Sequence, residues 1–221
     1  TEPTLAIGCE DGSLRIFSYA GGSLEYERTL FNAGKRVLSV AYHPVKSQIF
    51  CGCTNGSIHC LDSESGRSIY TMTGDMLKGA VTMIWSLIVL SDSTVVSGDN
   101  RGHVQFWDGN TGVLMVSFHQ HTAEILALTA SADEMQVFAS GIDCKVTCMR
   151  RIKQRSSSFV EEGETSAESY QQNVDNHWVY TASHRPHSHD VYALTVCPYS
   201  RFFNERKNKG EKENKEDGSS S

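Results

Sequence analysis

Three residues of the types that form a catalytic triad stand close together in the sequence: His121, Ser140 and Asp143. In a triad, an imidazole takes a proton from a serine hydroxyl while a carboxylate orients the ring. Such a serine needs a sharp strand-to-helix elbow and a loop that supplies an oxyanion hole. The stretch FASGIDC instead places Ser140 at the end of an expected strand and Asp143 in the turn after it. We therefore expect these residues to serve structure and not catalysis.

Cysteines and histidines offer two further kinds of cluster, because thiolates and imidazoles are ligands that zinc prefers. The clusters are Cys51-x-Cys53, Cys144-x3-Cys148 and, within SHRPHSHDV, His184, His187 and His189. Residues i and i+2 of a strand share a face, so Cys51 and Cys53 fit small core positions. His189 stands just before an apolar segment, where the repeat described below has a buried histidine. The sequence thus predicts no metal and no cofactor.

Charge and composition argue against several other functions. The formal net charge is −6, with 20 Lys plus Arg against 26 Asp plus Glu, so no general basic field exists to bind phosphate backbones. The single basic cluster, over 150–155, is expected to be a solvated strand edge. No phosphate-binding glycine loop, membrane span or signal peptide is recognisable. Seven cysteines, an odd number, fit a reducing compartment, so we expect an intracellular protein without membrane contact.

A hairpin over 94–113, TVVSGDNRGHVQFWDGNTGV, is the element that other segments repeat. It has a hydrophobic strand, a polar turn, an alternating strand that ends in Trp-Asp, and a second turn. Alignment on the first turn puts four residues in register at steps of 44, 46 and 42: Gly12, Gly56, Gly102 and Cys144. The Trp-Asp position then falls on Phe17-Ser18, Leu61-Asp62, Trp107-Asp108 and Met149-Arg150. This period is close to the ~40–45 residues of a WD40 repeat, which supplies four strands of a propeller blade.

The sequence therefore predicts an all-β fold, with a partial WD40 propeller over 1–198 and a disordered charged tail over 199–221. The expected repeats cover 4–31, 37–73, 83–119 and 125–183, and a fifth begins over 191–197. Within the fourth, the polar stretch 153–176 is expected to be an inserted loop or disordered.

The apolar inner strand over 37–43 is expected to be buried on both faces. The apolar segment over 83–90 is expected to be an inner strand, because its length and the turn after it favour a strand over the alternative, a buried helix. A propeller closes when its last blade meets its first, and these repeats are incomplete. We expect the isolated chain to be marginal or to self-associate, because an open propeller exposes apolar faces and strand edges.

Four stretches carry a closer resemblance: LAIGCEDGSLRIF, VLSVAYHP, SGDNRGHVQFWDGNTG and HSHDVYAL. They resemble the cirhin family of WD40 proteins, also described as the U three small nucleolar RNA-associated protein four family. The resemblance covers 5–198, is most specific in the third repeat, and does not extend into the tail. It implies that the chain is part of the N-terminal propeller of a longer protein.

The WD40 resemblance also implies a buried hydrogen-bond chain within a repeat. In that pattern a histidine precedes the inner strand, a serine or threonine lies in the second strand, an aspartate in the next turn, and a tryptophan in the third strand. In the fourth repeat these positions correspond to His121, Ser140 and Asp143, with Met149 in place of the tryptophan. Elsewhere the resemblance assigns the same structural network Trp107, Asp108 and His189.

The function that the resemblance implies is a non-enzymatic scaffold of the small-subunit processome. Such a protein acts in the nucleolus, in pre-ribosomal RNA transcription and 18S RNA maturation. Its partners would be other processome proteins, with U three RNA and pre-ribosomal RNA contacted indirectly. The alternative is a different WD40 adaptor, such as a ubiquitin-ligase substrate receptor or a signalling scaffold. An enzyme is the third choice, because propeller loops on a rigid frame usually bind partners and do not catalyse reactions.

Overall fold

The structure is a computed structural model that describes residues 4–74, 81–154, 175–185 and 188–197. In these residues the chain forms strands and no helix, and so none that is long and apolar enough to cross a membrane. The predicted tail over 199–221 lies outside the described residues, as does most of the predicted insertion, over 155–174. The ends of that insertion belong to strands.

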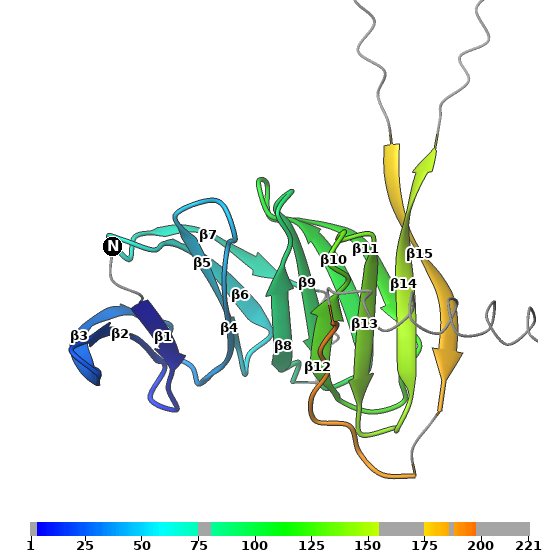
Figure 1. Cartoon of the computed structure of the whole chain (residues 1–221), viewed down its shortest axis with the longest axis horizontal. Coiled ribbons are helices and arrows are strands. Elements are labelled where there is room, and N and C mark those ends of the chain that lie inside the picture. Colours follow the sequence, from blue (N-terminus) through cyan, green and yellow to red (C-terminus); the bar gives the residue numbers. More distant parts are fainter. Residues whose placement is uncertain (1–3, 75–80, 155–174, 186–187, 198–221) are drawn as a thin grey trace, which may run out of the picture.

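The described strands form four antiparallel sheets, and in each sheet the spatial order of the strands is their order along the chain (Figure 1). The first sheet has three strands, β1 (Thr4–Gly8), β2 (Ser13–Ala20) and β3 (Ser23–Asn32). The second has β4 (Val37–Tyr42), β5 (Gln48–Cys53), β6 (Ser57–Asp62) and β7 (Ser68–Thr73). The third has β8 (Ile84–Val89), β9 (Thr94–Asp99), β10 (His103–Asp108) and β11 (Val113–His119). The fourth has β12 (Ile125–Ala130), β13 (Gln136–Gly141), β14 (Val146–Gln154) and β15 (Asp175–His184).

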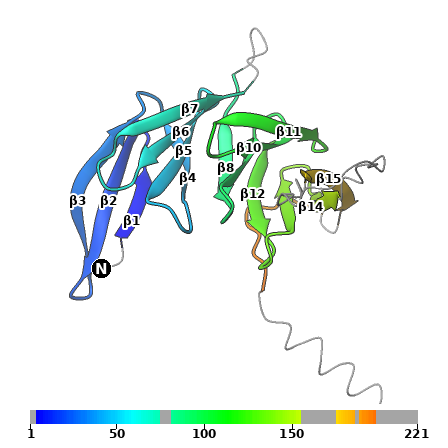
Figure 2. The same cartoon turned by 90° about the horizontal axis from the view of Figure 1, so that it is seen from above.

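The four sheets follow one another along an arc, as Figure 2 shows from above. The inner strand of each four-stranded sheet lies beside the inner strand of the next, so β4 contacts β8 and β8 contacts β12. In the first sheet, β1 takes the place of a second strand, because β1 pairs with β2 as β5 pairs with β6. The predicted all-β, partial propeller fold is confirmed.

The turns between the second and third strands share one backbone geometry. In each, the turn residue has a positive φ and its amide donates to the carbonyl three residues earlier, at 3.2 to 3.4 Å. The turn residues are Gly12, Gly56, Gly102 and Cys144, with φ of 86°, 77°, 84° and 63°. Three are glycines, as this left-handed region favours. The turns are equivalent, as the sequence register predicts.

Neighbouring sheets pack closely at a glycine four residues before the turn residue in the first three sheets. A Cβ atom built on Gly8 would lie 2.5 Å from Cγ1 of Val37, the first residue of β4. Gly52 and Gly98 stand in the same relation, at 2.5 Å, to the Cγ2 atoms of Ile84 and Ile125. A side chain at such a position would push two sheets apart. In the fourth sheet the equivalent residue is Ser140.

The expectation that the inner strand over 37–43 is buried on both faces is wrong. In β4 only Val37 is buried and Tyr42 is 39% exposed, whereas all six residues of β9 are buried. An inner strand is the edge of its sheet and faces the inside of the arc. A second strand lies between two strands of its own sheet and against the neighbouring sheets, so it loses more contact with water.

The fifth repeat also differs from the sequence expectation, because residues 191–197 form no strand. A strand requires a ladder of hydrogen bonds to a partner. The Val191 amide of this segment donates to the Gly141 carbonyl of the fourth sheet, at 3.0 Å. No second strand of a fifth sheet lies beside it in the described part of the chain.

Candidate interaction face

A buried histidine connects the fourth sheet to the loop that precedes it. His121 is 1% exposed, and its Nδ1 lies 2.9 Å from Oδ1 of Asp143 in the turn after β13. Its Nε2 lies 2.8 Å from Oγ1 of Thr147 in β14. That hydroxyl also approaches the Ala139 carbonyl, at 3.4 Å. The network therefore joins the loop before β12 to β13, β14 and the turn between them.

Ser140 is not the hydroxyl partner of His121. Its Oγ donates to the Lys145 carbonyl at 2.5 Å, across the base of the same turn. Thr147 was not predicted from the sequence, but the repeat register places Ser140 outside the serine position of the pattern. Ser97, the serine of the third sheet, lies five residues before its turn residue, and the same count in the fourth sheet reaches Ala139, one residue before Ser140.

The third sheet contains the tryptophan version of this contact. Trp107 is 2% exposed, and its Nε1 donates to Oγ of the fully buried Ser97 at 2.9 Å. Asp108 has a different task, because its carboxylate accepts the Asn110 amide at 2.9 Å and the Thr111 hydroxyl at 2.8 Å. Burial raises the pKa of Asp108, but these bonds outweigh it and hold the pKa below its usual value. Asp108 thus stabilises the turn between β10 and β11.

His189 lies elsewhere than predicted, since it is exposed. His121 is buried with partners in the turn after the second strand and in the third strand of its own sheet. The described residues contain no such strands after β15. His121 lies four residues before Ile125, and four residues before Val191 is His187, which lies outside the described residues.

The surroundings of His121 argue against catalysis there. Its side chain has no exposed area, and both ring nitrogens are engaged. Burial raises the pKa of Asp143, but hydrogen bonds from His121 and from the Thr122 amide outweigh that effect, and the pKa lies below its usual value. The carboxylate is therefore ionised near neutral pH, and the imidazole has no route to an external substrate.

The cysteine pairs that the sequence predicts not to bind metal lie in a strand, a turn and a core. Cys51 and Cys53 are fully buried in β5, within a hydrophobic core that also contains Leu14 and Ile49. Cys144 is the positive-φ residue of its turn, and Cys148 lies in β14. Within the part of the chain that the structure describes, no group of three or more potential ligands could hold a metal ion.

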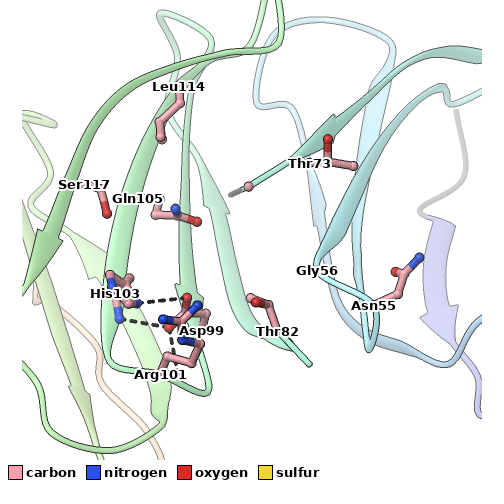
Figure 3. Close-up of a pocket in the computed structure, with 11 residues that line it drawn as sticks. Asn55, Gly56, Thr73, Thr82, Asp99, Arg101, His103, Gln105, Leu114 and Ser117 are labelled. Atoms are coloured by element: carbon pink, nitrogen blue, oxygen red, sulfur yellow. Dashed lines mark hydrogen bonds and ion pairs between the residues drawn. The ribbon is translucent and has the colours of Figure 1, made fainter. Parts of the chain in front are cut away.

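A pocket of about 210 Å³, lined by several polar residues, lies between the second and third sheets (Figure 3). The turns over 53–56 and 99–102 contribute to it, and these turns lie with the equivalent turns over 9–12 and 141–144 at one end of the sheets, which we call the turn face. Its lining combines turn and loop residues with residues of β7, β10 and β11: Asn55, Gly56, Thr73, Gly74, Thr82, Asp99, Arg101, His103, Gln105, Leu114 and Ser117.

Asp99 organises this pocket. It is 3% exposed and accepts the Arg101 and His103 amides at 2.9 and 2.8 Å. Its second oxygen lies 3.2 Å from Nδ1 of His103, whose ring stacks on His119 with centroids 4.3 Å apart. With these groups held in place, Arg101 and the amide of Gln105 are available to a polar ligand. The pocket can bind a short polar peptide segment or side chain, and it has no nucleophile paired with a base.

Comparison with known proteins shows which proteins this chain resembles. The chain is 35% identical over 198 residues to U3 small nucleolar RNA-associated protein 4 of Schizosaccharomyces pombe. The alignment covers 87% of the chain and 25% of that protein. It is 27% identical over 198 residues to the human homologue of that protein, covering 88% of the chain and 26% of the homologue. The chain is a relative of U3 small nucleolar RNA-associated protein 4.

More distant matches agree with the WD40 fold. WD repeat-containing protein 55 of Arabidopsis thaliana is 28% identical over 163 residues, covering 72% of the chain and 45% of that protein. A chain in the crystal structure of the mitotic checkpoint complex aligns with a TM-score of 0.65 at 20% identity, over 88% of this chain and 50% of its own length, which supports the fold alone. No protein-family model matches the chain. The chain spans about a quarter of the length of the U3 small nucleolar RNA-associated protein 4 relatives.

Proposed function

We propose that the chain acts as a non-enzymatic WD40 scaffold in ribosome biogenesis, as part of the small-subunit processome. The role would lie in nucleolar pre-ribosomal RNA transcription and 18S RNA maturation. The observation that carries this proposal is the 35% identity to U3 small nucleolar RNA-associated protein 4 along 87% of the chain. The similarity to U3 small nucleolar RNA-associated protein 4, the weaker similarity to WD repeat-containing protein 55 and the arc of four sheets support the proposed role as a WD40 scaffold.

The chemistry of the chain favours binding over catalysis. His121 and Asp143 form a His-Asp pair in which the histidine side chain has no exposed area. This pair is therefore closed to substrates. The turn face offers polar groups on a rigid frame, which is the usual arrangement of a recognition surface. Such a surface suits polar segments of neighbouring proteins in an assembly.

Contacts with RNA are proposed to be indirect. Several basic side chains of the described sheets are already paired with carboxylates. Arg15 lies 2.7 Å from Asp11, and Arg151 lies 2.6 Å from Asp92. Each phosphate that a protein neutralises requires an available cation, and the net charge of this chain is −6. Protein contacts would therefore hold the chain in the nucleolus.

The test is purification of the tagged chain from Schizosaccharomyces pombe. We expect small-subunit processome proteins and U3 RNA to be recovered, and we expect the proteins to remain after ribonuclease digestion. Arg101→Glu, which reverses a charge in the pocket of the turn face, should reduce recovery of these proteins several-fold. The matched control is Arg67→Glu, at the opposite end of the second sheet, which should leave recovery unchanged.

Other results would contradict the proposal. Recovery of a cullin complex in place of processome proteins would favour the ubiquitin-ligase adaptor. Loss of the protein partners on ribonuclease digestion, together with tight and steeply salt-dependent binding of U3 RNA to the purified chain, would show direct RNA binding.

A further inference from the structure

The turn of the third sheet is stabilised differently from the other three. In the first, second and fourth sheets an aspartate or asparagine precedes the turn residue, and its side-chain oxygen accepts the backbone amide two residues later, at 2.9 to 3.3 Å. These side chains are those of Asp11, Asn55 and Asp143. In the third sheet the same position is occupied by Arg101, whose side chain has no oxygen to accept that amide.

Asp99, two residues before Arg101, stabilises this turn instead. Its Oδ1 accepts the backbone amides of Arg101 and His103, at 2.9 and 2.8 Å. His103 directly follows the turn residue, as do the residues whose amides are bound in the other three turns. The turn therefore keeps its hydrogen bond, and position 101 is released to carry a side chain with another role.

The guanidinium of Arg101 is a half-buried cation at the wall of the pocket. Two other arginines of the turn face, Arg15 and Arg36, form salt bridges with Asp11 and Glu10. Within the part of the chain that the structure describes, Arg101 forms no salt bridge. A guanidinium that is partly removed from water gains most from an anion that accepts its N–H groups.

The pocket leaves space beside this cation. A Cβ atom built on Gly74, which directly follows β7, would lie 3.5 Å from both Nε2 and Oε1 of Gln105 in β10. Because Gly74 has no side chain, the gap between the two sheets stays open, with a volume of about 210 Å³. Figure 3 shows Arg101 and Gln105 on the third sheet, across from Thr73 of the second. A guanidinium and a primary amide, both hydrogen-bond donors, thus line a space that can take a side chain.

We propose that this pocket binds the carboxylate of an aspartate or glutamate side chain of a partner protein. Arg101 supplies the positive charge in a planar fork that matches the two oxygens of a carboxylate, and the Gln105 amide supplies a further donor. The inference rests on the proposed function, because it names the partner group that the turn face recognises.

The charges around the pocket favour a carboxylate over other ligands. A phosphate requires available cations, whereas the described lining contains one arginine and no lysine, in a chain of net charge −6. A basic ligand would be repelled by Arg101. An apolar ligand would remove water from Arg101 and Gln105 without replacing their hydrogen bonds, which costs free energy.

Zero-length coupling tests the chemistry of the ligand. Arg101→Lys keeps the positive charge and provides a primary amine, which a water-soluble carbodiimide joins to a carboxylate in contact with it. The tagged full chain with this substitution is purified from Schizosaccharomyces pombe together with its partners, treated and digested. We expect mass spectrometry to find position 101 joined to an aspartate or glutamate of another protein. The matched control is Arg67→Lys, at the opposite end of the second sheet, which should not couple to that partner residue.

Two further substitutions separate charge from space. Arg101→Gln removes the charge, and Gly74→Leu fills the pocket while the charge remains. Each should lower recovery of the coupled protein several-fold, whereas Arg101→Lys should keep most of it. The melting temperature should be unchanged in all three, because Asp99 stabilises the turn and a Cβ on Gly74 makes only ordinary contacts. A loss of recovery at unchanged melting temperature is then a loss of binding.

The outcomes distinguish this inference from the proposed function. Coupling of position 101 to a carboxylate of a protein outside the processome would support the inference and contradict the proposed function. Recovery of processome proteins without coupling, or recovery that Arg101→Gln and Gly74→Leu leave unchanged, would overturn the inference alone. Coupling only to Asp99 of the same chain would also overturn it. So would recovery that is lost after phosphatase treatment, because the ligand would then be a phosphate.

Discussion

The third and fourth sheets have the same topology and the same turn geometry, yet different groups stabilise their interiors. In the third, the Trp107 indole donates to Ser97 between β9 and β10. In the fourth, Ala139 and Met149 occupy these two positions, and neither side chain can form such a bond. Thr147, two residues before Met149, supplies a hydroxyl to His121, which also contacts Asp143.

The difference shows which features the repeat requires and which it can replace. Both sheets need a turn residue with positive φ, because the chain must reverse within a few residues. Both also need a polar contact that ties the second strand to the third. That contact can move to another side chain, because β13 and β14 bring several residues within reach. Both sheets also link the turn to the preceding loop, through Asp143 and His121 in the fourth and through the Asn100 side chain, which contacts the Met83 amide and the Val81 carbonyl, in the third.

The largest effect is expected from His121→Ala. The substitution leaves the Asp143 carboxylate and the Thr147 hydroxyl without their partner in a site with almost no water contact. The free energy of unfolding should fall by about 3 kcal/mol, at the upper end for a lost buried partner. Urea denaturation measures the change in the free energy of unfolding, and Gln120→Ala, at the neighbouring exposed residue, is the control. An unchanged stability would contradict the assigned network.

Gly98→Ala is expected to have the next largest effect. The new Cβ would lie 2.5 Å from Cγ2 of Ile125 and would force the third and fourth sheets apart. Overpacking of this kind costs about 2 kcal/mol. Thermal unfolding should show the loss. Ser140→Ala, at the equivalent position of the fourth sheet, adds no atom and should cost only about 1 kcal/mol, through its bond to Lys145.

Trp107→Phe sharpens the comparison further. Phenylalanine fills most of the same space but cannot donate to Ser97, so the free energy of unfolding should fall by about 1 to 2 kcal/mol. The double variant Trp107→Phe with Ser97→Ala should recover part of this loss, because no hydroxyl then remains unpaired. In the fourth sheet, Met149→Leu should cost less than about 1.5 kcal/mol, since the volume is similar and no hydrogen bond is involved.

The smallest effect concerns acid stability. The pKa of Asp143 is lower in the folded chain than in the unfolded chain, so its stabilising contribution is present above the unfolded pKa of about 4 and is lost as pH falls below it. Asp143→Asn should therefore make stability less dependent on pH below about pH 4. Denaturation midpoints between about pH 2.5 and 6 would show this, and parallel curves for both proteins would refute it. Asp108→Asn should have a similar but weaker effect, because no imidazole contacts that carboxylate.

The sequence alone determined the all-β class and the equivalence of the four turns. Hydrophobic alternation and left-handed turn residues are local properties, and their spacing can be read without coordinates. The resemblance to U three small nucleolar RNA-associated protein four was also present in the residues. The sequence further pointed to His121 and Asp143, which the fold brings to 2.9 Å.

Only the tertiary structure decided which groups complete the contacts. Thr147 partners His121 because β13 and β14 pair in one register, and a shift of one residue moves a side chain to the other face. The burial of β9, and not of β8, depends on the sheets packed around it. The exposure of His189 and the lack of a strand over 191–197 have the same reason. A strand sequence becomes a strand, and a buried histidine becomes buried, only when another segment lies beside it, and that neighbour is not encoded in the local pattern.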